Sequence, residues 1–353
     1  MKKAVYALGM MSGSSLDGID LAFCRFYFKN NTWLYSIEIA ETVEYTDFWR
    51  AKLMRATDLP SNELLRLDVE FGKFLGETAA HFIVKNQLKP DLVASHGHTL
   101  FHEPGFGYSF QLGRGAFIAR QTATIVVSDF RNADIYFGGQ GAPLVPVGDE
   151  LLFGEYKACV NIGGIANLSY SGKGVRKGYD ICGANQLLNT LSTEIGLPYD
   201  AGGKLAASGI VDVDLFEKLN SDSYFIRPAP KSLSNQYVVE NFVSVLADTQ
   251  IPLSNRLAAA VSHISHQMAH ALNQIPVGRV LVTGGGAHNH FLFGSIQSLT
   301  PHELVVPEDR LVDFKEAMVF AFMGVLRIQN QVNCLASVTG ASCDSLGGVI
   351  HLP

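Results

Sequence analysis

The sequence contains few of the residues that mark several common protein classes. Cysteine is scarce: the five thiols are widely spaced, and no Cys-x-x-Cys pair occurs. This pattern supports neither a zinc ribbon nor a disulfide framework. It favours reduced cysteines in a cytosolic protein.

Positive charge is also limited. The 27 Lys and Arg residues are outnumbered by 33 Asp and Glu, which gives a net charge of −6. Proteins that bind nucleic acid through its phosphate backbone need a basic surface. The composition therefore argues against a nucleic-acid partner.

Long apolar segments are missing as well. No stretch approaches the ~20 apolar residues that span a bilayer. The N-terminal apolar run stops at Gly9, so it is too short for a secretory signal peptide. We therefore expect a cytoplasmic protein without a membrane partner.

The remaining composition is that of a packed globular protein. Hydrophobic residues make up 47% of the 353 residues, and charged residues 17%. Such a chain can bury a core, and its length suits two domains. Strand-like segments alternate with helical patterns, which indicates an α/β fold. The longest helices are expected at 61–86, 255–274 and about 313–329.

A segment rich in glycine and proline, 133–146 (ADIYFGGQGAPLVP), shows no period of helix or strand. We interpret it as a loop and a boundary. This predicts an N-terminal domain at 1–145 and a C-terminal domain at 146–353, with the C-terminal helix able to pack back on the first. Both domains begin with strand, glycine turn and strand, which suggests two related halves.

Glycine, in contrast, is abundant and clustered. The first cluster lies in GMMSGSSLDGID, residues 9–20, between two apolar runs. Backbone N–H groups of such a turn form an anion-binding nest, and Ser12, Ser14 and Ser15 add hydroxyl donors. Asp17 or Asp20 would then hold a hydrated Mg²⁺ against a phosphate. The alternative is a tight hairpin with solvated polar residues. The candidate phosphate-binding residues are Gly13, Ser14, Ser15, Leu16, Asp17, Gly18, Ile19 and Asp20.

Two further glycine turns lie in the second half. In VNIGGIANLS, 160–169, Asn161 and Asn167 flank Gly163 and Gly164 between two strands, which would suit a second phosphate contact. In VLVTGGGAHN, 280–289, three glycines end a strand, where a base or sugar can lie against the backbone. A plain hairpin and a tight strand-to-helix turn are the alternatives. The candidate residues of the last turn are Gly284, Gly285, Gly286 and Asn289.

One carboxylate is placed as a general base would be. Asp180 in YDICGANQLLN, 179–189, ends a short strand just before a helix. From there it can project into a cleft and accept a proton. An ordinary aspartate, with a pKa of ~3.9, is ionised at neutral pH without tuning. The alternative is a capping or turn carboxylate.

Histidines occur in two groups. Strand alternation would place His96 and His98 of SHGHTLFHEP on one side of a strand, as a conceivable metal pair. His263, His266 and His270 share a spacing that would place them on one face of the helix 255–274. A polar or interface face is the alternative for that helix, which could also serve a homodimer.

Arg131 lies between Asp129 and Asp134 in DFRNAD, 129–134. The three charges could form a surface ion network of little energy. They could also bind an anionic group of a substrate, which a guanidinium does well.

Three glycine turns for phosphate, phosphate and nucleoside, in this order, resemble the actin, hexokinase and sugar-kinase superfamily. The blocks SHGHT, FQLGRGAFIA, DFRNADIYFGGQGAPLVP, VNIGGIANLS, PKS, VLVTGGGAHN and SVTGAS further resemble the 1,6-anhydro-N-acetylmuramic acid kinases over nearly the whole chain. The resemblance implies an α/β, two-domain actin/hexokinase-like (ribonuclease H-like) fold with an interdomain cleft.

This sequence departs from the family pattern at three places. Around Asp180 it reads DICGAN where the family commonly has Asp-Thr-Gly-Pro-Gly-Asn. After PKS it reads LSNQ where Thr-Gly-Arg-Glu is common, and His98 stands where glutamine is frequent. Asp180 and Asn185 of the pattern are retained, whereas the arginine after PKS is missing.

The resemblance also implies ATP, Mg²⁺ and a bicyclic sugar recycled from the bacterial cell wall. Water would open the anhydro bridge with Asp180 as the base, and O6 would receive the γ-phosphoryl group, giving N-acetylmuramic acid 6-phosphate. Asp17 would lie on the metal side. The residues expected to contact the sugar or to act at a hinge are Asp129, Arg131, Asp134, Gln140, Lys231 and Glu316, with Arg131 or Lys231 facing the lactyl carboxylate.

Three other functions stay open from the sequence. One is an ordinary sugar kinase of the same fold, in which Asp180 deprotonates a hydroxyl. Another is a non-catalytic, ATP-regulated protein of the actin superfamily. The third is a metal hydrolase built on the histidines.

Overall fold

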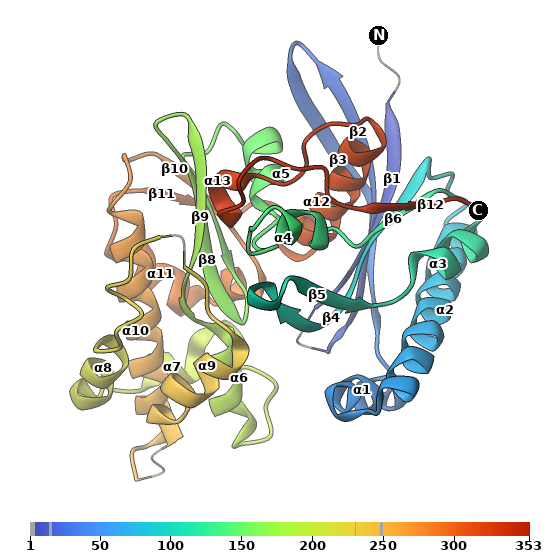
Figure 1. Ribbon diagram of the computed structural model, residues 1–353. Helices are drawn as coiled ribbons and strands as arrows, with labels where there is room; N and C mark the ends of the chain where they lie inside the picture. Colours follow the sequence, from blue (N-terminus) through green and yellow to red (C-terminus); the bar gives the residue numbers. More distant parts are fainter. Residues whose placement is uncertain (1–3, 14–15, 230, 248–249) are drawn as a thin grey trace. The chain divides into compact units, whose positions relative to one another are not determined.

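The computed structural model describes residues 4–13, 16–229, 231–247 and 250–353 of the chain (Figure 1). It divides into two compact units. Unit 1 comprises the chain up to Leu152 together with Phe314–Pro353, and unit 2 comprises Phe153–Asp313. Each unit is built on its own mixed β-sheet.

The sheet of unit 1 has the strand order β12-β6-β4-β1-β2-β3, and β5 pairs with β4 at one end. The pairs β1–β2 and β2–β3 are antiparallel, whereas β1–β4 and β4–β6 are parallel. The strands are β1 Val5–Ser12, β2 Gly18–Lys29, β3 Thr32–Glu44, β4 Leu92–Glu103, β5 Tyr108–Leu112, β6 Val126–Ser128 and β12 Val349–His351. The helices are α1 Asp47–Met54, η1 Ala56–Asp58, α2 Ser61–Lys85, η2 Pro104–Phe106, α3 Gly115–Thr122, α4 Asn132–Tyr136, α5 Pro146–Leu152, α12 Asp309–Ile328, which starts in unit 2 and enters unit 1 at Phe314, and α13 Ala336–Thr339.

Helices cover both faces of this sheet (Figure 1). α2 packs on one face through Leu67, Phe71 and Leu75 in a core shared with β1 and β2. α12 packs on the other face, so close to β1 that a Cβ at Gly9 would lie 1.8 Å from the carbonyl oxygen of Ala317. The glycine is therefore required by backbone contact with α12.

The sheet of unit 2 repeats this topology. Its order is β11-β10-β7-β8-β9, with β7–β8 and β8–β9 antiparallel and β7–β10 and β10–β11 parallel. The strands are β7 Ala158–Ile162, β8 Ile165–Gly172, β9 Val175–Gly183, β10 Arg279–Thr283 and β11 Glu303–Val305. The helices are α6 Asn185–Thr193, η3 Ala201–Gly203, α7 Lys204–Ser208, α8 Val213–Asn220, α9 Asn235–Val238, η4 Val239–Val243, η5 Val245–Ala247, α10 Leu253–Leu272, η6 Gly285–His288 and α11 His290–Ser298.

The two units thus share one arrangement: three antiparallel strands followed by two parallel ones, in the order 3-2-1-4-5. This confirms the predicted α/β fold with two related ribonuclease H-like halves. In both units the first hairpin turn, β1–β2 or β7–β8, follows the strand at the centre of the sheet. Both turns are glycine-rich, as expected from the sequence.

The predicted domain limits, 1–145 and 146–353, need correction. The division falls after Leu152, because α5 belongs to unit 1. The C-terminal segment from Phe314 onward also belongs to unit 1, because Phe322 packs against Phe26 of β2 and β12 extends the first sheet beside β6. The expected loop 133–146 contains most of α4 and the first residue of α5.

The long amphipathic helix of unit 2, α10, is mostly internal. Its apolar residues, among them Leu257, Val261 and Ile264, are buried in the core of unit 2. Its apolar face is therefore occupied within the unit. The homodimer that this helix suggested stays a prediction.

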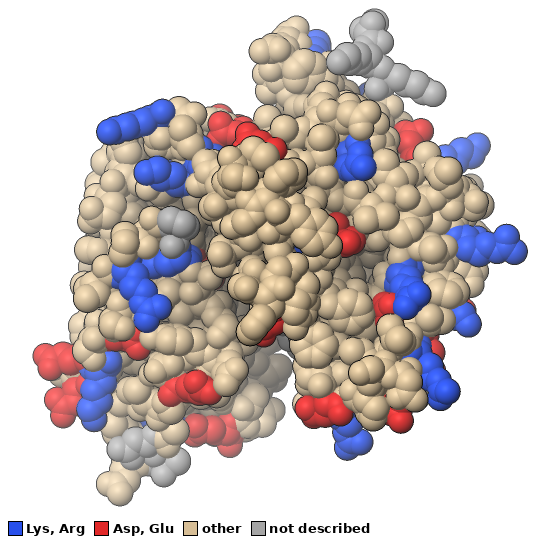
Figure 2. Space-filling view, viewed as in Figure 1, with Lys and Arg blue, Asp and Glu red and all other residues tan. Residues whose placement is uncertain are grey.

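In the described part of the chain, no helix is both long and apolar enough to cross a membrane. On the face of the molecule shown in Figure 2, the described Lys and Arg side chains are interspersed with Asp and Glu and form no continuous basic area.

Candidate active site

A row of polar residues crosses four neighbouring strands of unit 2. Thr283 of β10 pairs with Asn161 of β7, Asn161 pairs with Asn167 of β8, and Asn167 pairs with Asp180 of β9. Directly opposite residues in a sheet project from the same face. The register thus brings Asp180 into line with both asparagines of the second glycine turn.

A β-bulge sets this alignment. The β8–β9 register shifts between Ala166 and Asn167, so that Ala166 pairs with Cys182 and Asn167 with Asp180. Ile181 is the extra residue, and it is buried. Bulges re-aim side chains beside functional sites, and this one places Asp180 opposite Asn167.

The Asp180 carboxylate is half-buried and held at one oxygen. Its Oδ2 accepts a hydrogen bond from the backbone N–H of Leu233 at 2.9 Å, and its Oδ1 has no hydrogen-bond partner among the described residues. The hydroxyl of Tyr224 fixes the main chain by donating to the Asp180 carbonyl at 2.6 Å. One lone-pair side of the carboxylate is thus available to a substrate proton.

Burial changes the acidity of this group. Desolvation raises the pKa of Asp180 to about 6, although the Leu233 hydrogen bond opposes the shift. The sequence predicted an untuned carboxylate. A pKa just below neutral pH improves a general base, because the carboxylate stays ionised yet binds a proton more strongly.

Lys231 lies beside this site but does not form an ion pair with Asp180 in the described structure. Its ammonium group donates to the carbonyl of Tyr224 at 3.1 Å and lies 4.6 Å from the centroid of the Tyr224 ring. Burial lowers its pKa, and nearby Arg227 lowers it further. The backbone N–H of Asp180 donates to the Lys231 carbonyl, which ties the PKS loop to β9.

The β7–β8 turn contacts the start of α6. The carbonyls of Gly163 and Gly164 accept hydrogen bonds from the backbone N–H groups of Asn185 and Ala184, at 3.0 and 2.8 Å. The side chain of Asn185 donates to the carbonyl of Ile162 at 3.0 Å. These hydrogen bonds connect the carbonyl groups of the turn to the start of α6.

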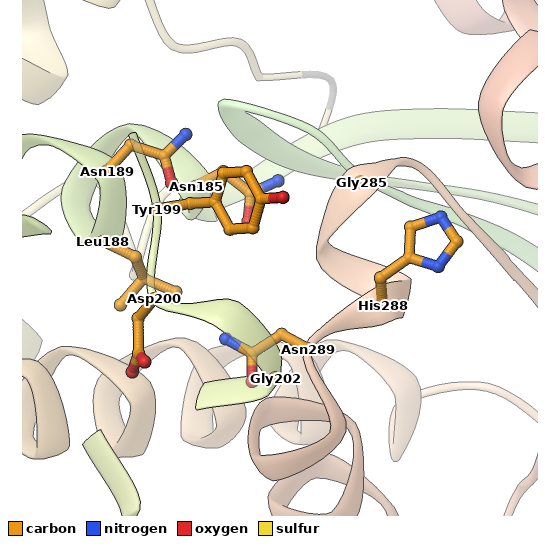
Figure 3. Close-up of a pocket in the computed structure, with 9 residues that line it drawn as sticks. All are labelled: Asn185, Leu188, Asn189, Tyr199, Asp200, Gly202, Gly285, His288 and Asn289. Carbon is orange, nitrogen blue, oxygen red and sulfur yellow. The ribbon is translucent and has the colours of Figure 1, made fainter. Parts of the chain in front are cut away.

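The third glycine turn lines a pocket of about 350 Å³ in unit 2 (Figure 3). Gly284 has a φ of +84°, and a Cβ there would lie 2.6 Å from the Asn161 side chain. The turn therefore passes close over the β7 end. The pocket is lined by Asn185, Leu188, Asn189, Tyr199, Asp200, Gly202, Gly285, His288 and Asn289.

Two polar residues that line this pocket, Asn289 and Asp200, also stabilise the ends of helices. Asn289 caps α11 by accepting from the N–H of Leu292, and Asp200 accepts from the N–H groups of Leu205 and Ala206 at the start of α7. Tyr199 is 60% exposed, which leaves a ring face open at the pocket. A flat ligand can stack there.

The sequence did not identify most of this pocket. Gly285 and Asn289 were predicted, whereas Asn185, Tyr199 and His288 were not assigned. The glycine pair 202–203 in YDAGGK was visible as a cluster. This pair was the one sequence feature that could have indicated the pocket. In the structure both glycines have a positive φ beside it.

In unit 1 the first glycine turn joins β1 to β2. Ser14 and Ser15 lie outside the described residues. Gly13 accepts from the N–H of Leu16, whose φ is +58°, and Gly18 lies so close to β3 that a Cβ would be 2.4 Å from the Val43 carbonyl. Ile19 is fully buried, so its side chain serves the core.

The two aspartates of this turn differ. Asp17 is exposed, whereas Asp20 is half-buried and accepts a hydrogen bond from Thr42 Oγ1 at 2.6 Å. Ser12, expected as a phosphate donor, is 3% exposed, and its hydroxyl bonds inside the unit. Asp17 is therefore the better candidate for a hydrated metal ion.

The predicted sugar residues of unit 1 gather around Arg131. Its guanidinium donates to His96 Nε2, at 2.7 Å from Nη2, and to the Gly141 carbonyl at 2.8 Å. Burial lowers its pKa to about 10, with Glu316 opposing the shift. Burial and the charge of Asp20 raise the pKa of half-buried Glu316, whereas Lys315 and Arg131 lower it.

Asp134 and Gln140 have different surroundings. Asp134 is fully buried and accepts from the N–H of Gly141 at 2.8 Å and from Thr339 Oγ1 at 2.7 Å. Its carboxylate is enclosed by the glycine loop, so its geometry favours a hinge or positioning role over sugar contact. Gln140 has an exposed side chain, and its N–H donates to the Thr339 carbonyl.

Asp129 lines a second pocket in unit 1, of about 390 Å³, with Asn132, Arg114 and His351. Its φ is +58°, and its Oδ1 accepts from Asn132 Nδ2 at 2.7 Å. Burial raises the pKa of Asp129, although the bonds from Asn132 oppose the shift.

The alternation that made His96 and His98 a conceivable metal pair is interrupted in the structure. The β1–β4 register shifts between Met10 and Ser12, where Gly97 adopts a φ of +72°. The bulge sends the two rings to opposite faces of the sheet. His96 contacts the Phe320 ring of α12 in a tilted arrangement, and His98 meets the Phe71 ring of α2 edge-on.

The histidines of α10 share one helix face, as predicted, but they do not form a metal site. His263 is fully buried and bonds Asn220 Oδ1 at 2.9 Å, whereas His266 and His270 are exposed. Among the residues that the structure describes, no group of three or more His, Cys, Asp or Glu side chains could hold a metal ion. The histidine-based metal hydrolase therefore has no support in the described part of the chain.

The sequence is similar to known proteins over nearly its whole length. The family model for anhydro-N-acetylmuramic acid kinase matches residues 5–353. The protein of that name from Synechococcus elongatus is 34% identical over 97% of this chain and 98% of its own length, and the one from Pseudomonas syringae pv. tomato is 34% identical over 98% and 99%. Among solved structures, a ROK family glucokinase from Streptomyces griseus in complex with glucose and AMPPNP covers 90% of this chain and 97% of its own, at 10% identity and a TM-score of 0.41. With a family match over nearly its full length and relatives above 30% identity, this chain belongs to the anhydro-N-acetylmuramic acid kinase family.

Proposed function

We propose that this chain is an ATP-dependent kinase that opens 1,6-anhydro-N-acetylmuramic acid by hydrolysis and phosphorylates O6, giving N-acetylmuramic acid 6-phosphate. The observation that carries the proposal is the Asp180 carboxylate, which has one anchored and one available oxygen and a pKa near 6. It lies in register with Asn161 and Asn167 of the second glycine turn.

The chemistry requires a base that deprotonates water and an electrophile that captures the leaving oxygen O6. Asp180 takes a proton from water as the water oxygen bonds to C1 of the sugar. The C1–O6 bond breaks, its electron pair stays on O6, and O6 bonds to the γ-phosphorus while ADP leaves. An inverting glycosidase needs an acid to protonate the leaving oxygen. Here the phosphoryl group takes the place of that proton, so a single carboxylate is sufficient.

ATP binding is assigned to the three glycine turns. In unit 2, the pocket beside Gly284, Gly285 and Gly286 suits a nucleoside, with Tyr199 as the stacking surface. The β7–β8 turn presents Asn161, Gly163, Gly164 and Asn167 for phosphate. In unit 1, the turn from Gly13 to Asp20 presents backbone N–H groups, as an anion nest does.

The turn of unit 1 fits Mg²⁺. The exposed Asp17 carboxylate is a hard oxygen donor, and no three-ligand cluster exists in the described chain. Mg²⁺ typically keeps several waters and binds through one or two carboxylates and the substrate phosphates, so it needs no such cluster. When bound, it would neutralise charge on the transferred phosphoryl group.

The sugar is assigned to the residues around Arg131. His96 and the Gly141 carbonyl hold its guanidinium in place for a carboxylate such as the lactyl group. Glu316, Asp129 and Gln140 are the candidates for the sugar hydroxyl and acetamido groups. Lys231 is the second candidate for the lactyl carboxylate, although its ammonium already bonds main-chain carbonyls.

The family match favours this reaction over an ordinary sugar kinase or a non-catalytic actin-like protein. The experiment that tests it is mass analysis of the product formed from the anhydro sugar, ATP and Mg²⁺ in ¹⁸O-water. Label at C1 together with phosphate on O6 is the expected result. A phosphorylated product without label would mean that a hydroxyl, not water, is activated. We further propose that the reaction takes place in the cytoplasm, in peptidoglycan turnover.

A further inference from the structure

A chain of three buried side chains lies directly below the first phosphate turn. Ser12, the last residue of β1, bonds the hydroxyl of Tyr45 at 2.7 Å and His98 Nδ1 at 2.9 Å. All three residues are nearly inaccessible, at 3%, 2% and 6% exposed. Each comes from a different segment: the end of β1, the residue after β3, and β4.

The bulge at Gly97 makes this contact possible. Leu92 and Ala94 of β4 pack against Gly324 of α12, whereas Val93 packs in the core with α2. Regular alternation would therefore turn residue 98 toward α12. The extra residue turns His98 toward α2 instead, in register with Ser12.

The direction of the hydrogen bonds follows from the number of donors. Burial lowers the pKa of His98 to about 4, so the ring is neutral at pH 7 and one of its nitrogens accepts. Ser12 is the hydrogen-bond partner found for the Tyr45 hydroxyl within the described chain. Both hydroxyl hydrogens are paired only if Tyr45 donates to Ser12 and Ser12 donates to His98 Nδ1.

We propose that His98 is a positioning residue for the first phosphate-binding turn: by accepting the Ser12 hydroxyl, it holds the last residue of β1 in place for ATP. This inference rests on the proposed function of that turn. Ser12 immediately precedes Gly13 and pairs with Ile19 across the hairpin. Loss of the acceptor would leave a buried hydroxyl unpaired at the base of the turn, and the turn would shift to satisfy it.

Two substitutions separate hydrogen bonding from packing. His98→Leu keeps most of the volume but removes the acceptor. His98→Asn loses volume but places Oδ1 as many bonds from the backbone as Nδ1. We expect His98→Leu to raise the KM and the Kd for ATP about fivefold, the size of one neutral hydrogen bond. His98→Asn should stay within about twofold of wild type, as one preserved hydrogen bond predicts.

Val93→Ala serves as the matched control for stability. It removes core volume from the same strand and the same face without touching Ser12. Its Tm should fall while its KM for ATP stays at the wild-type value. If Val93→Ala and His98→Asn raise this KM as much as His98→Leu, the effect is one of packing and the proposal is overturned.

A double-mutant cycle covers the case in which His98→Leu folds poorly. Ser12→Ala should raise the KM for ATP by a similar factor, and Ser12→Ala/His98→Leu should add little to it, because both remove one link. Additive effects would overturn the proposal. ATP titration by calorimetry distinguishes failure of the proposed function from failure of the positioning role. If the wild type does not bind ATP, the proposed function is refuted. If the wild type binds ATP and His98→Leu binds it equally well, only the positioning role is refuted.

Discussion

Asp180 lies opposite Asn167 across β8 and β9, because a one-residue bulge at Ile181 shifts the register of the two strands. Without the bulge, alternation would turn Asp180 to the other face of the sheet. The position of the proposed base therefore depends on a local irregularity, and its surroundings make the assignment testable.

The first prediction concerns Asp180 itself. Asp180→Asn keeps the shape and can still meet the Leu233 N–H through its amide oxygen, but cannot take a proton. We expect less than about 1% of the wild-type kcat, since general-base catalysis contributes about 10²–10⁴-fold. ATP affinity, measured by calorimetry, should be unchanged.

Asp212→Asn is the matched control, because Asp212 caps α8 by accepting from the Leu215 N–H. This variant should keep nearly full activity, since asparagine caps about as well as aspartate. Activity of Asp180→Asn close to that of the control would refute the base assignment.

The second prediction is a pH dependence. A base acts only when ionised, and burial raises the pKa of Asp180 to about 6. The rate should therefore be full above this pKa and fall about tenfold per pH unit below it, as expected for one essential ionised group. The measurement is kcat/KM for the anhydro sugar from pH 4.5 to 8.5. An acidic limb near pH 4 would mean that Asp180 is not desolvated, or is not the base.

The third prediction concerns the pocket of unit 2. Tyr199 presents an exposed ring at the pocket lined by Gly285 and Asn289 (Figure 3). If the base of ATP stacks on it, Tyr199→Ala should weaken ATP binding by about fivefold or more, as loss of about 1 kcal/mol of stacking would do. Tyr199→Phe should retain affinity.

Tyr136→Ala is the control for that pair, because this ring is 75% exposed in unit 1 and lines none of the pockets described. Equal loss of affinity in Tyr136→Ala and Tyr199→Ala would remove Tyr199 from the nucleotide site. The Kd for a non-hydrolysed ATP analogue is the quantity to compare.

The fourth prediction concerns Asp134. Asp134→Ala would leave the buried N–H of Gly141 without its acceptor and would leave the Thr339 hydroxyl with only its longer 3.3 Å bond to the Leu335 carbonyl. Each unpaired group costs about 1–3 kcal/mol, so the free energy of unfolding should fall by about 3 kcal/mol or more. Urea unfolding measures it.

Asp344→Ala is the surface control, because exposed Asp344 accepts one hydrogen bond, from the N–H of Ala336. Its loss should be clearly smaller. A normal midpoint for Asp134→Ala, combined with a raised KM for the sugar, would instead return Asp134 to direct contact with the substrate.

Much of the fold was predictable, because the spacing of hydrophobic residues and the positions of glycine and proline reflect local backbone geometry. The helix expected at 61–86 is α2, and the strand–turn–strand patterns at both starts are β1–β2 and β7–β8. The segment 235–247 is less regular: it divides into α9, a π-helical turn and a 3₁₀ turn. Short-range patterns do not contain that information.

The site was predicted in its types of residue and less well in its pairings. Asp180, the glycine turns and Arg131 stood out because their chemistry is unusual for their local context. Tyr199 did not stand out, because a single tyrosine in a loop belongs to no repeating pattern or motif. His96 and His98 were paired wrongly, since a bulge at one glycine reverses alternation and leaves no mark other than that glycine.

By itself, the sequence determined the order of strands, turns and helices, the α/β class, and the family to which the chain belongs. Only the tertiary structure decided that the first unit extends to Leu152, that Asp180 aligns with Asn167, and that His98 faces Ser12. The physical reason is the range of the interactions. Backbone preferences act over a few residues, whereas registers, bulges and buried hydrogen bonds join segments that lie far apart in the chain.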